Sequence, residues 1–379
     1  MIAFSIAAVS CLIWLYLTGA RGKFWRVAPT ALPSLESTSA PRIAVIVPAR
    51  NEADIIAQPV LSLLQQDYPG PLRVFVVDDH SSDDTAQLVR EAAAAKPGAL
   101  TIVSAAPLPS GWTGKMWALS QGVQYASTFA PDYFLFTDAD IVHASHSVST
   151  SVALAQAGNR DLVSFMVKLH CESLAERALI PAFVFFFFQL YPPEWVNDRK
   201  SNAAAAAGGD ILVRADALAR IGGISSIRNQ LIDDCALARE VKRGGSVWLG
   251  LTEQARSIRP YGTFAVIGRM ISRSAFYQLR HSFWLLLATL LGLGITYLAP
   301  PVVVFFGGWA ALLGAIAWAL MTISFVPMVR FYSLCPLWAA TLPAIALFYA
   351  GATIHSAIQY WVGRGGEWKD RVQDTRPAA

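Results

Sequence analysis

Two aspartates one residue apart follow a short apolar stretch in FLFTDADIVH, residues 134–143. Asp138 and Asp140 stand at the end of a predicted buried strand, where a carboxylate without a partner is costly to desolvate. Carboxylate oxygens are ligands that suit Mg²⁺ and Mn²⁺. We therefore expect a divalent metal, Mg²⁺ or Mn²⁺, at Asp138 and Asp140, where it would neutralise a bound diphosphate. Two solvated loop acids are the alternative, and His143 stays open as a further metal ligand.

Two other predicted strands also end in polar clusters. PARNE (48–52) closes the first strand, and VDDHSSDD (77–84) closes the second with Asp78 and Asp79. Acidic side chains at strand ends can accept hydrogen bonds from the ribose hydroxyls of a nucleotide. The chain has neither G-x-G-x-x-G nor G-x-x-x-x-G-K-[ST], so the usual dinucleotide and ATP cradles are missing. Capping of the following helix is the alternative role for these acids.

A third acidic pair opens the segment IDDCALAREVKRGG, residues 232–245. Asp233 and Asp234 begin a predicted helix, whose dipole favours negative charge at that end. The functional interpretation is that one of the two carboxylates acts as a general base. In the preceding AAGGDILVRADAL (206–218), the two glycines allow close backbone approach, and Asp210 is placed to receive a hydroxyl.

Apolar runs alternate with helical patterns through the middle of the chain. Continuous apolar strands separated by helices are typical of a mostly parallel sheet covered on both faces, which is an α/β fold. In such sheets ligands bind outside the carboxyl ends of the strands, so the three polar strand ends should meet. The predicted strands are 42–49, 72–79, 100–105, 133–140 and 161–169, and the predicted helices are 51–66, 81–95 and 114–127.

Long uncharged segments lie at both ends of the chain. Of the 379 residues, 54% are hydrophobic and only 15% are charged, against about 25% charged in an average soluble domain. About 20 apolar residues cross a bilayer as a helix. The uncharged stretches predict one N-terminal span and about three C-terminal spans, with a turn at Pro300 and Pro301. The expected order is an anchor (1–20), a linker (21–41), a globular domain (42–263), an interfacial helix (264–282), a membrane region (283–363) and a basic tail (364–379).

Basic residues near the spans predict the orientation. Arg21, Lys23 and Arg26 follow the first span, so we expect a multi-pass protein of the inner (plasma) membrane with a cytoplasmic globular domain. The basic tail conflicts with an odd number of C-terminal spans. A net charge of +4, clustered near the membrane segments, suits lipid headgroups and not nucleic acid. Four scattered cysteines argue against a disulfide framework or a structural zinc site.

Two further segments allow more than one interpretation. Residues 173–195, rich in phenylalanine, are either a buried core helix or a surface that dips into the bilayer to meet a lipid substrate. Residues 264–281 have the pattern of an amphipathic helix, with Arg269, Arg273 and Arg280 on one face. Such a helix can lie along the membrane surface.

With these motifs assembled, the chain resembles the family 2 glycosyltransferases, an inverting group with the Rossmann-like, nucleotide-diphospho-sugar-binding A-type fold (GT-A). The anchor, the phenylalanine-rich segment and the terminal spans further resemble the hopene-biosynthesis-associated membrane glycosyltransferases. The stretches that carry the resemblance occur in the family's order: VIVPARNEADII, VFVVDDHSSDDT, GKMWALSQG, FLFTDADI, AAGGDILVRADAL and IDDCALAREVKRGG.

The resemblance implies a nucleotide-diphosphate sugar donor, a lipid acceptor such as a hopanoid, and transfer of a hexosyl or N-acetylhexosaminyl group. Asp138 and Asp140 would bind the donor diphosphate through the metal, Asp78 and Asp79 would bind the nucleoside, and Lys115 would lie near the phosphates. Asp234 would be the base, with Asp233 beside it. The remaining implied substrate-binding residues are Pro48, Ala49, Asn51 and Glu52 for the nucleotide, and Gly209 and Asp210 for the acceptor.

Two departures from the family matter. The acid before the base is usually Glu, whereas here it is Asp233, which leaves either member of the pair open as the base. The polymerising members carry Q-x-x-R-W, whereas FYQLRHS (276–282) keeps Gln278 and Arg280 without the tryptophan or the spacing. The resemblance therefore favours a single transfer, with Arg280 still a candidate contact for the diphosphate. A polyprenyl phosphate or a diacylglycerol is the alternative acceptor, and a non-catalytic scaffold or transporter is the alternative class.

Overall fold

The computed structural model describes residues 1–26, 40–94, 96 and 98–366. The chain forms two compact units. A globular unit contains residues 29–170 and 195–259, and a helical unit contains residues 1–28, 171–194 and 260–379. Residues 171–194 fall inside the predicted globular domain by sequence, yet they pack with the terminal helices. Most of the predicted linker and of the basic tail lies outside the described residues.

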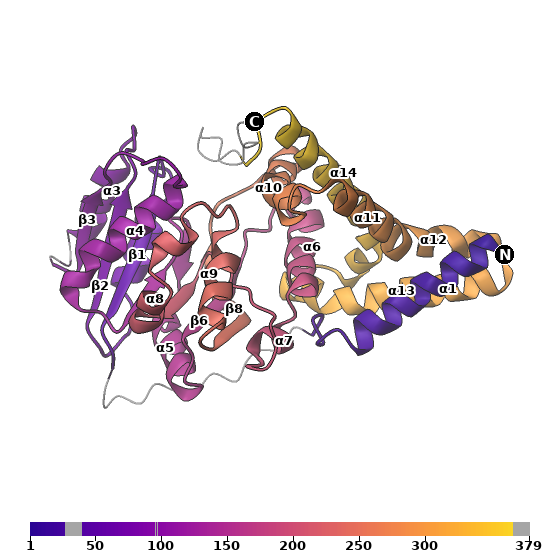
Figure 1. Ribbon diagram of the computed structural model, residues 1–379, viewed down its shortest axis with the longest axis horizontal. Helices are drawn as coiled ribbons and strands as arrows, with labels where there is room; N and C mark the ends of the chain where they lie inside the picture. The colour runs from indigo at the N-terminus through magenta and orange to yellow at the C-terminus, as the bar shows by residue number, and fades with distance from the viewer. Residues whose placement is uncertain (27–39, 95, 97, 367–379) are drawn as a thin grey trace. The chain divides into compact units, whose positions relative to one another are not determined.

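An eight-stranded sheet forms the centre of the globular unit (Figure 1), in the order β3-β2-β1-β4-β7-β6-β8-β5. Strands β3, β2, β1 and β4 run parallel to one another, as do β6 and β8, while β7 and β5 pair antiparallel with their neighbours. The mostly parallel α/β sheet is therefore confirmed. The strands are β1 (Ile43–Ala49), β2 (Leu72–Asp78), β3 (Leu100–Ser104), β4 (Tyr133–Phe136), β5 (Ile141–His143), β6 (Leu162–Lys168), β7 (Ile211–Arg214) and β8 (Val247–Ser257).

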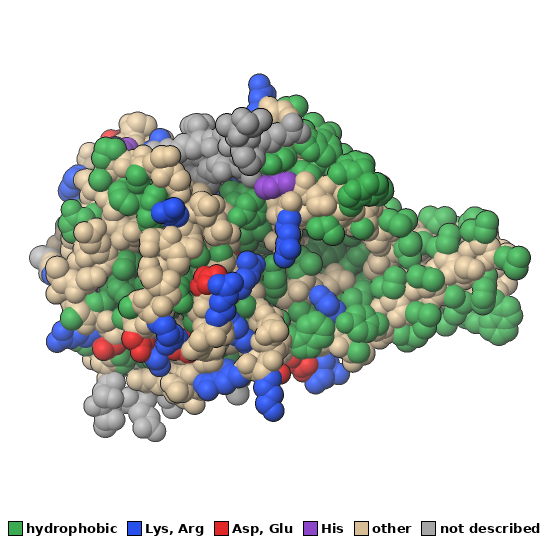
Figure 2. Space-filling view, viewed as in Figure 1, with side chains coloured by type: hydrophobic (Ala, Val, Ile, Leu, Met, Phe, Trp, Pro, Cys, Tyr) green, Lys and Arg blue, Asp and Glu red, His purple; other side chains and the backbone are tan. Residues whose placement is uncertain are grey.

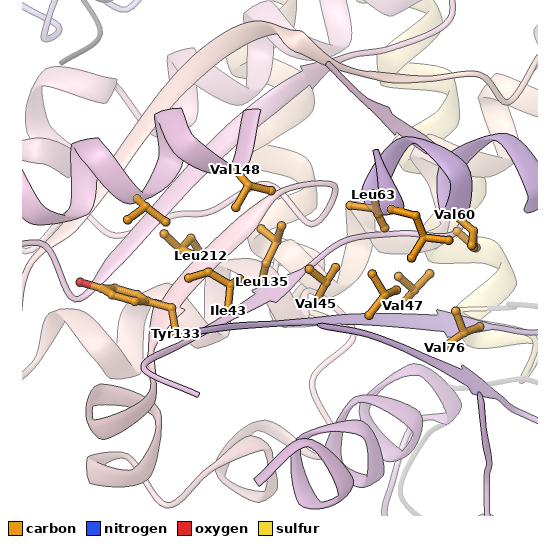
Figure 3. Close-up of a cluster of buried hydrophobic side chains, with 14 of the residues drawn as sticks. Ile43, Val45, Val47, Val60, Leu63, Val76, Tyr133, Leu135, Val148 and Leu212 are labelled. Carbon is orange, nitrogen blue, oxygen red and sulfur yellow. The ribbon is translucent and has the colours of Figure 1, made fainter. Parts of the chain in front are cut away.

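Helices cover both faces of this sheet. On one face, Val45 and Val47 of β1 point toward Val60 and Leu63 of α2, together with side chains of α3 and α5 (Figure 3). On the other face, Gly122 of α4 lies against the side chain of Ile46. Both faces of β1 are thus buried, which explains its continuous apolar run. The helices are α2 (Ala57–Leu64), α3 (Thr85–Ala93), α4 (Gly114–Ala126), α5 (Ser147–Ala157), α7 (Pro193–Asn197), α8 (Ala215–Arg220) and α9 (Asp233–Lys242).

The sequence patterns located five strands but missed β5, β7 and β8. Strand β5 has only three residues, and β7 has four, which is too short for a hydrophobic period to stand out. The Thr, Glu and Gln side chains in the second half of β8 break its apolar run. These three strands matter for the site because they enclose the loop that carries Asp138 and Asp140.

Among its described residues, the helical unit has four helical stretches long and apolar enough to cross a membrane. They are Ile2–Gly19, Phe283–Phe306, Gly308–Phe331 and Pro336–Trp361. This agrees with the prediction of one N-terminal span and about three C-terminal spans. Figure 2 shows hydrophobic side chains over the surfaces of α1, α12 and α13. The helices of this unit are α1 (Ile2–Gly19), α6 (Leu174–Leu190), α10 (Phe264–Gln278), α11 (Phe283–Leu293), α12 (Ala299–Val303), α13 (Gly308–Phe331) and α14 (Leu342–Trp361).

The predicted turn at Pro300 and Pro301 is wrong. Both prolines lie inside α12, in the first residues of the helix, where a missing N–H costs nothing. The chain turns instead at Gly307 and Gly308, whose positive φ angles of 72° and 56° suit glycine. A π-helical turn, Gly294–Leu298, joins α11 to α12.

The phenylalanine-rich segment forms α6, and its buried side chains support the core interpretation. The ring of Phe185 is 1% exposed and contacts the rings of Phe24 and Phe325. The predicted amphipathic helix is present as α10, with Ile267, Ile271 and Phe276 buried. Thr263 caps α10 by accepting a hydrogen bond from the backbone N–H of Val266.

A fully buried carboxylate joins the start of α6 to the chain that leads into α10. Glu176 Oε2 accepts hydrogen bonds from the backbone N–H groups of Glu172 and Ser173, at 2.9 and 2.8 Å. Its Oε1 accepts from the N–H groups of Tyr261 and Gly262, at 2.7 and 3.2 Å. Burial alone would raise the pKa of Glu176, but the four N–H donors outweigh it and lower the pKa to about 2.

We expect Glu176→Gln to lower the free energy of unfolding by about 3 kcal/mol, because an amide cannot accept from all four N–H donors. Since the folded-state pKa is depressed, this stabilisation is present above about pH 4.5 and is lost as the pH falls toward about 2. Thermal unfolding in detergent measures it. Glu194→Gln is the matched control, because its ion pair with Lys23 is half exposed and contributes little. Equal effects of the two substitutions would contradict the prediction.

Candidate active site

Asp138 and Asp140 lie in the tight turn between β4 and β5. Strand β4 ends at Phe136, and Ile141 then pairs with Ser257 of β8. Because the strand has ended, the two carboxylates need not point to opposite faces of the sheet. Asp138 is the more accessible, with 37% of its side chain exposed, and Asp140 is mostly buried.

Charged side chains from two other stretches of the chain, and the backbone of a third, converge beside Asp138. Lys115, in the first turn of α4, lies 2.8 Å from Asp138 Oδ1 and 3.5 Å from Asp233 Oδ2. Asp234 Oδ2 accepts a hydrogen bond from the backbone N–H of Gly208 at 3.0 Å. These five residues line one pocket, whose apolar wall includes Met116, Phe136, Ile211 and Leu237. The two sequence motifs TDAD and IDD therefore meet at one place, as the family resemblance implies.

Gly208 lies between these charged side chains, and its missing side chain leaves room for one small group. A Cβ atom added there would lie 3.4 Å from Lys115 Nζ, 3.6 Å from Asp234 Oδ2 and 3.8 Å from Asp138 Oδ2. The three charged groups thus surround a volume that a single methyl group would fill. Gly209 is different, since its Cβ would lie 2.9 Å from the side chain of Val167.

Helix caps and neighbouring charges position Lys115 and Asp234. The Thr113 side chain caps α4 by accepting from the N–H of Met116, which fixes the turn that carries Lys115. Burial lowers the pKa of Lys115, but the negative charges of Asp138 and Asp233 outweigh it and raise the pKa overall. Lys115 is therefore a permanent cation in the pocket, suited to an anionic ligand.

Asp234 has the properties of a general base. Burial first, and then the negative charge of Asp233, raise its pKa to about 6, against the opposing charge of Lys115. Its two oxygens accept from the N–H groups of Gly208 and Cys235, which fix its orientation. Each carboxylate oxygen keeps a second lone pair, so Asp234 can still take a proton.

A second group of contacts surrounds Asp140. Its Oδ2 accepts a hydrogen bond from Ser257 Oγ at 2.8 Å and contacts Arg259 Nε at 3.2 Å. Arg259 also contacts Glu52 Oε2 at 2.7 Å, so one guanidinium joins the loops that follow β1 and β4. Burial, and next the charge of Asp138, raise the pKa of Asp140, while Arg259 and Ser257 lower it.

Asp138 and Asp140 fit a divalent metal whose remaining ligands come from a bound diphosphate. In the described part of the chain, no cluster of three His, Cys, Asp or Glu side chains forms a complete metal cage. Among the described residues, however, the contacts of Asp138 go to Oδ1 and those of Asp140 to Oδ2, which leaves one oxygen on each. Mg²⁺ and Mn²⁺ are commonly held by one or two carboxylates plus substrate phosphates. The donor set therefore suits a metal completed by a diphosphate.

The polar ends of β1 and β2 form a neighbouring cluster. Asn51, with φ of 50°, accepts a hydrogen bond from the N–H of Ser82 through its side-chain oxygen. Asp78 accepts from the N–H of Ser81. Asp79 is buried, and its carboxylate lies 3.7 Å from Arg50 and 3.3 Å from His80. The predicted nucleotide residues Ala49, Asn51, Asp78 and Asp79 are thus brought together, and Pro48 reaches the Asp138 pocket.

Three predicted residues do not lie in the Asp138 pocket of the globular unit. Gly209 packs on Val167, and the lining of the pocket passes from Gly208 to Ile211 without Asp210. Asp210 is 2% exposed, and burial raises its pKa to about 7. Arg280 belongs to the helical unit, in the turn after α10. The roles of these three residues in binding substrate stay predictions.

His143 is not available as a metal ligand. Its Nε2 hydrogen-bonds Thr137 Oγ1 at 2.9 Å, and its Nδ1 hydrogen-bonds Ser147 Oγ at 3.2 Å. Burial lowers its pKa to about 4, so the ring is neutral. Thr137 in turn donates to the carbonyl of Gly209. His143 therefore stabilises the loop that carries Asp138 and Asp140 through its hydrogen bonds to Thr137 and Ser147.

Sequence reasoning missed Arg259 and Ser257. Ser257 ends β8 and Arg259 lies two residues beyond it, more than 100 residues after the aspartate that they contact. The stretch SIRP matches no motif of the resemblance. The sequence contained no signal that could have found them.

The fold is similar to that of a solved mannosyltransferase from Pyrobaculum calidifontis in complex with GDP-Man and Mn²⁺. The two superimpose with a TM-score of 0.60 at 20% identity, over 93% of this chain and 98% of that one. At that identity the likeness concerns the fold alone, which is Rossmann-like and of the GT-A type. Residues 44–222 match the family model described as glycosyl transferase family 2. That match covers 179 of the 379 residues, a little under half of the chain.

Part of the chain is also similar in sequence to a curated protein. The chain is 36% identical over 100 residues to 4,4'-diaponeurosporenoate glycosyltransferase of Staphylococcus aureus (strain USA300). The matched segment is 26% of this chain. The match spans about a quarter (24%) of the length of that relative.

Proposed function

We propose that this protein transfers a sugar from a nucleotide-diphosphate sugar to a hydroxyl group of a membrane lipid, with inversion at the anomeric carbon. The observation that carries the proposal is the convergence of Asp138, Lys115 and Asp234 around Gly208. One cation, one candidate metal ligand and one buried base surround a single open volume. Such a set suits departure of a diphosphate and activation of a hydroxyl at the same place.

In the proposed reaction, Asp234 takes the proton of the acceptor hydroxyl. The acceptor oxygen forms a bond to the anomeric carbon from the face opposite the diphosphate, and the bond between that carbon and the diphosphate oxygen breaks. The leaving nucleotide keeps the electron pair, and Lys115 lies where it can neutralise the new charge. A divalent metal held by Asp138 and Asp140 would supply further neutralisation of the diphosphate.

The acceptor is proposed to be a lipid for three reasons. In the described part of the chain, four helices are long and apolar enough to cross a membrane, and α10 has an amphipathic pattern. A curated relative is named as a glycosyltransferase of 4,4'-diaponeurosporenoate. Within this class, the resemblance to hopene-associated enzymes favours a hopanoid over a polyprenyl phosphate or a diacylglycerol. The basic residues after the first span favour a multi-pass protein of the inner membrane with a cytoplasmic globular unit.

Purified full-length protein should transfer radiolabel from a nucleotide sugar to lipid. We would supply labelled UDP- and GDP-sugars singly, with hopanoid, carotenoid and polyprenyl phosphate acceptors in separate reactions. We expect a labelled lipid in at least one combination, its loss on treatment with EDTA, and its return on addition of Mn²⁺ or Mg²⁺. Full transfer after exhaustive chelation would contradict the metal. Absence of transfer and of nucleotide-sugar binding in every combination would favour the scaffold or transporter.

A further inference from the structure

Resting on the proposed function, we infer that Arg259 is a positioning residue that holds Asp140 for the divalent metal and couples it to Glu52 of the nucleotide pocket. The residue lies two positions after the end of β8 and belongs to none of the motifs of the resemblance. Its role differs from those of the groups that touch the donor, because Arg259 acts through the carboxylates that it fixes.

Residues 257–259, the last residue of β8 and the two that follow, hold Asp140 through both backbone and side-chain contacts. The N–H of Ile258 donates to the backbone carbonyl of Asp140 at 3.0 Å. Ser257 Oγ donates to Asp140 Oδ2 and accepts from the backbone N–H of Arg259. The guanidinium then contacts the same Oδ2. Three consecutive residues thus hold Asp140, and two of them, Ser257 and Arg259, contact the same carboxylate oxygen.

The orientation of the Asp140 carboxylate determines how tightly it can bind a metal. Because Ser257 and Arg259 contact Oδ2, the other oxygen accepts no hydrogen bond from the described residues. Groups that hydrogen-bond a ligating carboxylate commonly contribute 10- to 100-fold in metal affinity, since they fix the ligand before the metal arrives. Without Arg259, the side chain of Asp140 would lose its ion pair with a cation and could rotate.

The charge of Arg259 does not exclude a metal nearby. A lone cation would repel Mn²⁺, but Arg259 lies between two carboxylates, Asp140 and Glu52. The planar guanidinium can contact both at once, which a lysine ammonium cannot do with the same geometry. Glu52 is itself fixed by a hydrogen bond from its N–H to Thr85 Oγ1 at 2.8 Å. Arg259 therefore joins two rigid strand ends.

The test compares Arg259→Met with Arg256→Met in full-length protein. Arg256 is exposed, lies three residues earlier on β8 and carries the same charge, so it controls for the loss of a cation. Binding of Mn²⁺ is followed by the electron paramagnetic resonance signal of free Mn²⁺, with saturating UDP in one series and GDP in another. We expect Arg259→Met to weaken Mn²⁺ binding by at least about tenfold. Arg256→Met should stay within about twofold of wild type.

Arg259→Lys keeps the experiment decisive if Arg259→Met does not fold. It preserves the charge and should unfold at nearly the wild-type temperature, yet bind Mn²⁺ at least about threefold more weakly. Binding by both Arg259 variants within twofold of wild type overturns the inference and leaves the proposed function intact. A wild-type protein that binds no Mn²⁺ with either nucleotide overturns the proposed metal site and this inference together.

Discussion

Asp234→Asn should lower kcat/KM for sugar transfer by about 10³-fold, the size of effect expected when a general base is removed. The amide keeps the shape of the carboxylate but cannot take a proton. Asp234 is the better candidate of the pair because burial and the charge of Asp233 raise its pKa to about 6. Asp233 is instead engaged by Lys115 at 3.5 Å.

Asp233→Asn is the matched control for this assignment. Loss of its charge should act through Lys115, so we expect a drop of about tenfold, seen mainly as a higher KM for the donor. Transfer from labelled nucleotide sugar, together with thermal unfolding of each variant, separates chemistry from stability. A larger loss in Asp233→Asn than in Asp234→Asn would assign the base to Asp233.

The pH profile provides a second measure of the same assignment. The base acts in its ionised form, and its pKa is raised, so activity requires a pH above that value. In wild type, kcat/KM should therefore fall about tenfold per pH unit below about pH 6. In Asp234→Asn this acidic limb should disappear from the residual activity. A limb that persists unchanged would belong to another group.

The sequence allowed the acidic residues to be found but not their division of labour. D-x-D stood out because a carboxylate at the end of a buried strand is costly to desolvate, and a parallel sheet gathers strand ends at one edge. IDD stood out as an acidic pair at the start of a predicted helix. Nothing in IDD distinguishes Asp233 from Asp234. The difference comes from Lys115 and from the N–H of Gly208, which lies 26 residues earlier in the chain. Contacts of that range depend on the folded chain.

Other features could not be predicted from a sequence pattern, for related reasons. Arg259 contacts Asp140 across 119 positions, so no local spacing could reveal the pair. Pro300 and Pro301 looked like a turn, but proline is tolerated in the first turn of a helix, and the actual break uses positive φ at Gly307. His143 looked like a possible ligand beside D-x-D, and only its two buried hydrogen bonds identify it as structural.

Gly208→Ala should abolish most of the activity without harming the fold. The φ of Gly208 lies outside the left-handed region, so alanine meets no backbone strain there. Its methyl group would meet Lys115 Nζ, Asp234 Oδ2 and Asp138 Oδ2 at 3.4 to 3.8 Å, which is ordinary contact. The same methyl would occupy the volume in which the diphosphate and the acceptor hydroxyl are proposed to meet. A displacement of about 1 Å there can cost about 100-fold in rate.

Two other glycines make the test specific. Gly244→Ala also meets its nearest side-chain atom at 3.4 Å, on Arg220, and should leave both activity and stability unchanged. Gly209→Ala would bring its methyl to 2.9 Å from Val167, so we expect a lower unfolding temperature. Activity and thermal unfolding of the three variants distinguish a filled site from a strained core. Full activity in Gly208→Ala would mean that the reacting groups do not meet between Lys115 and Asp234, because a methyl group at that point would then be harmless.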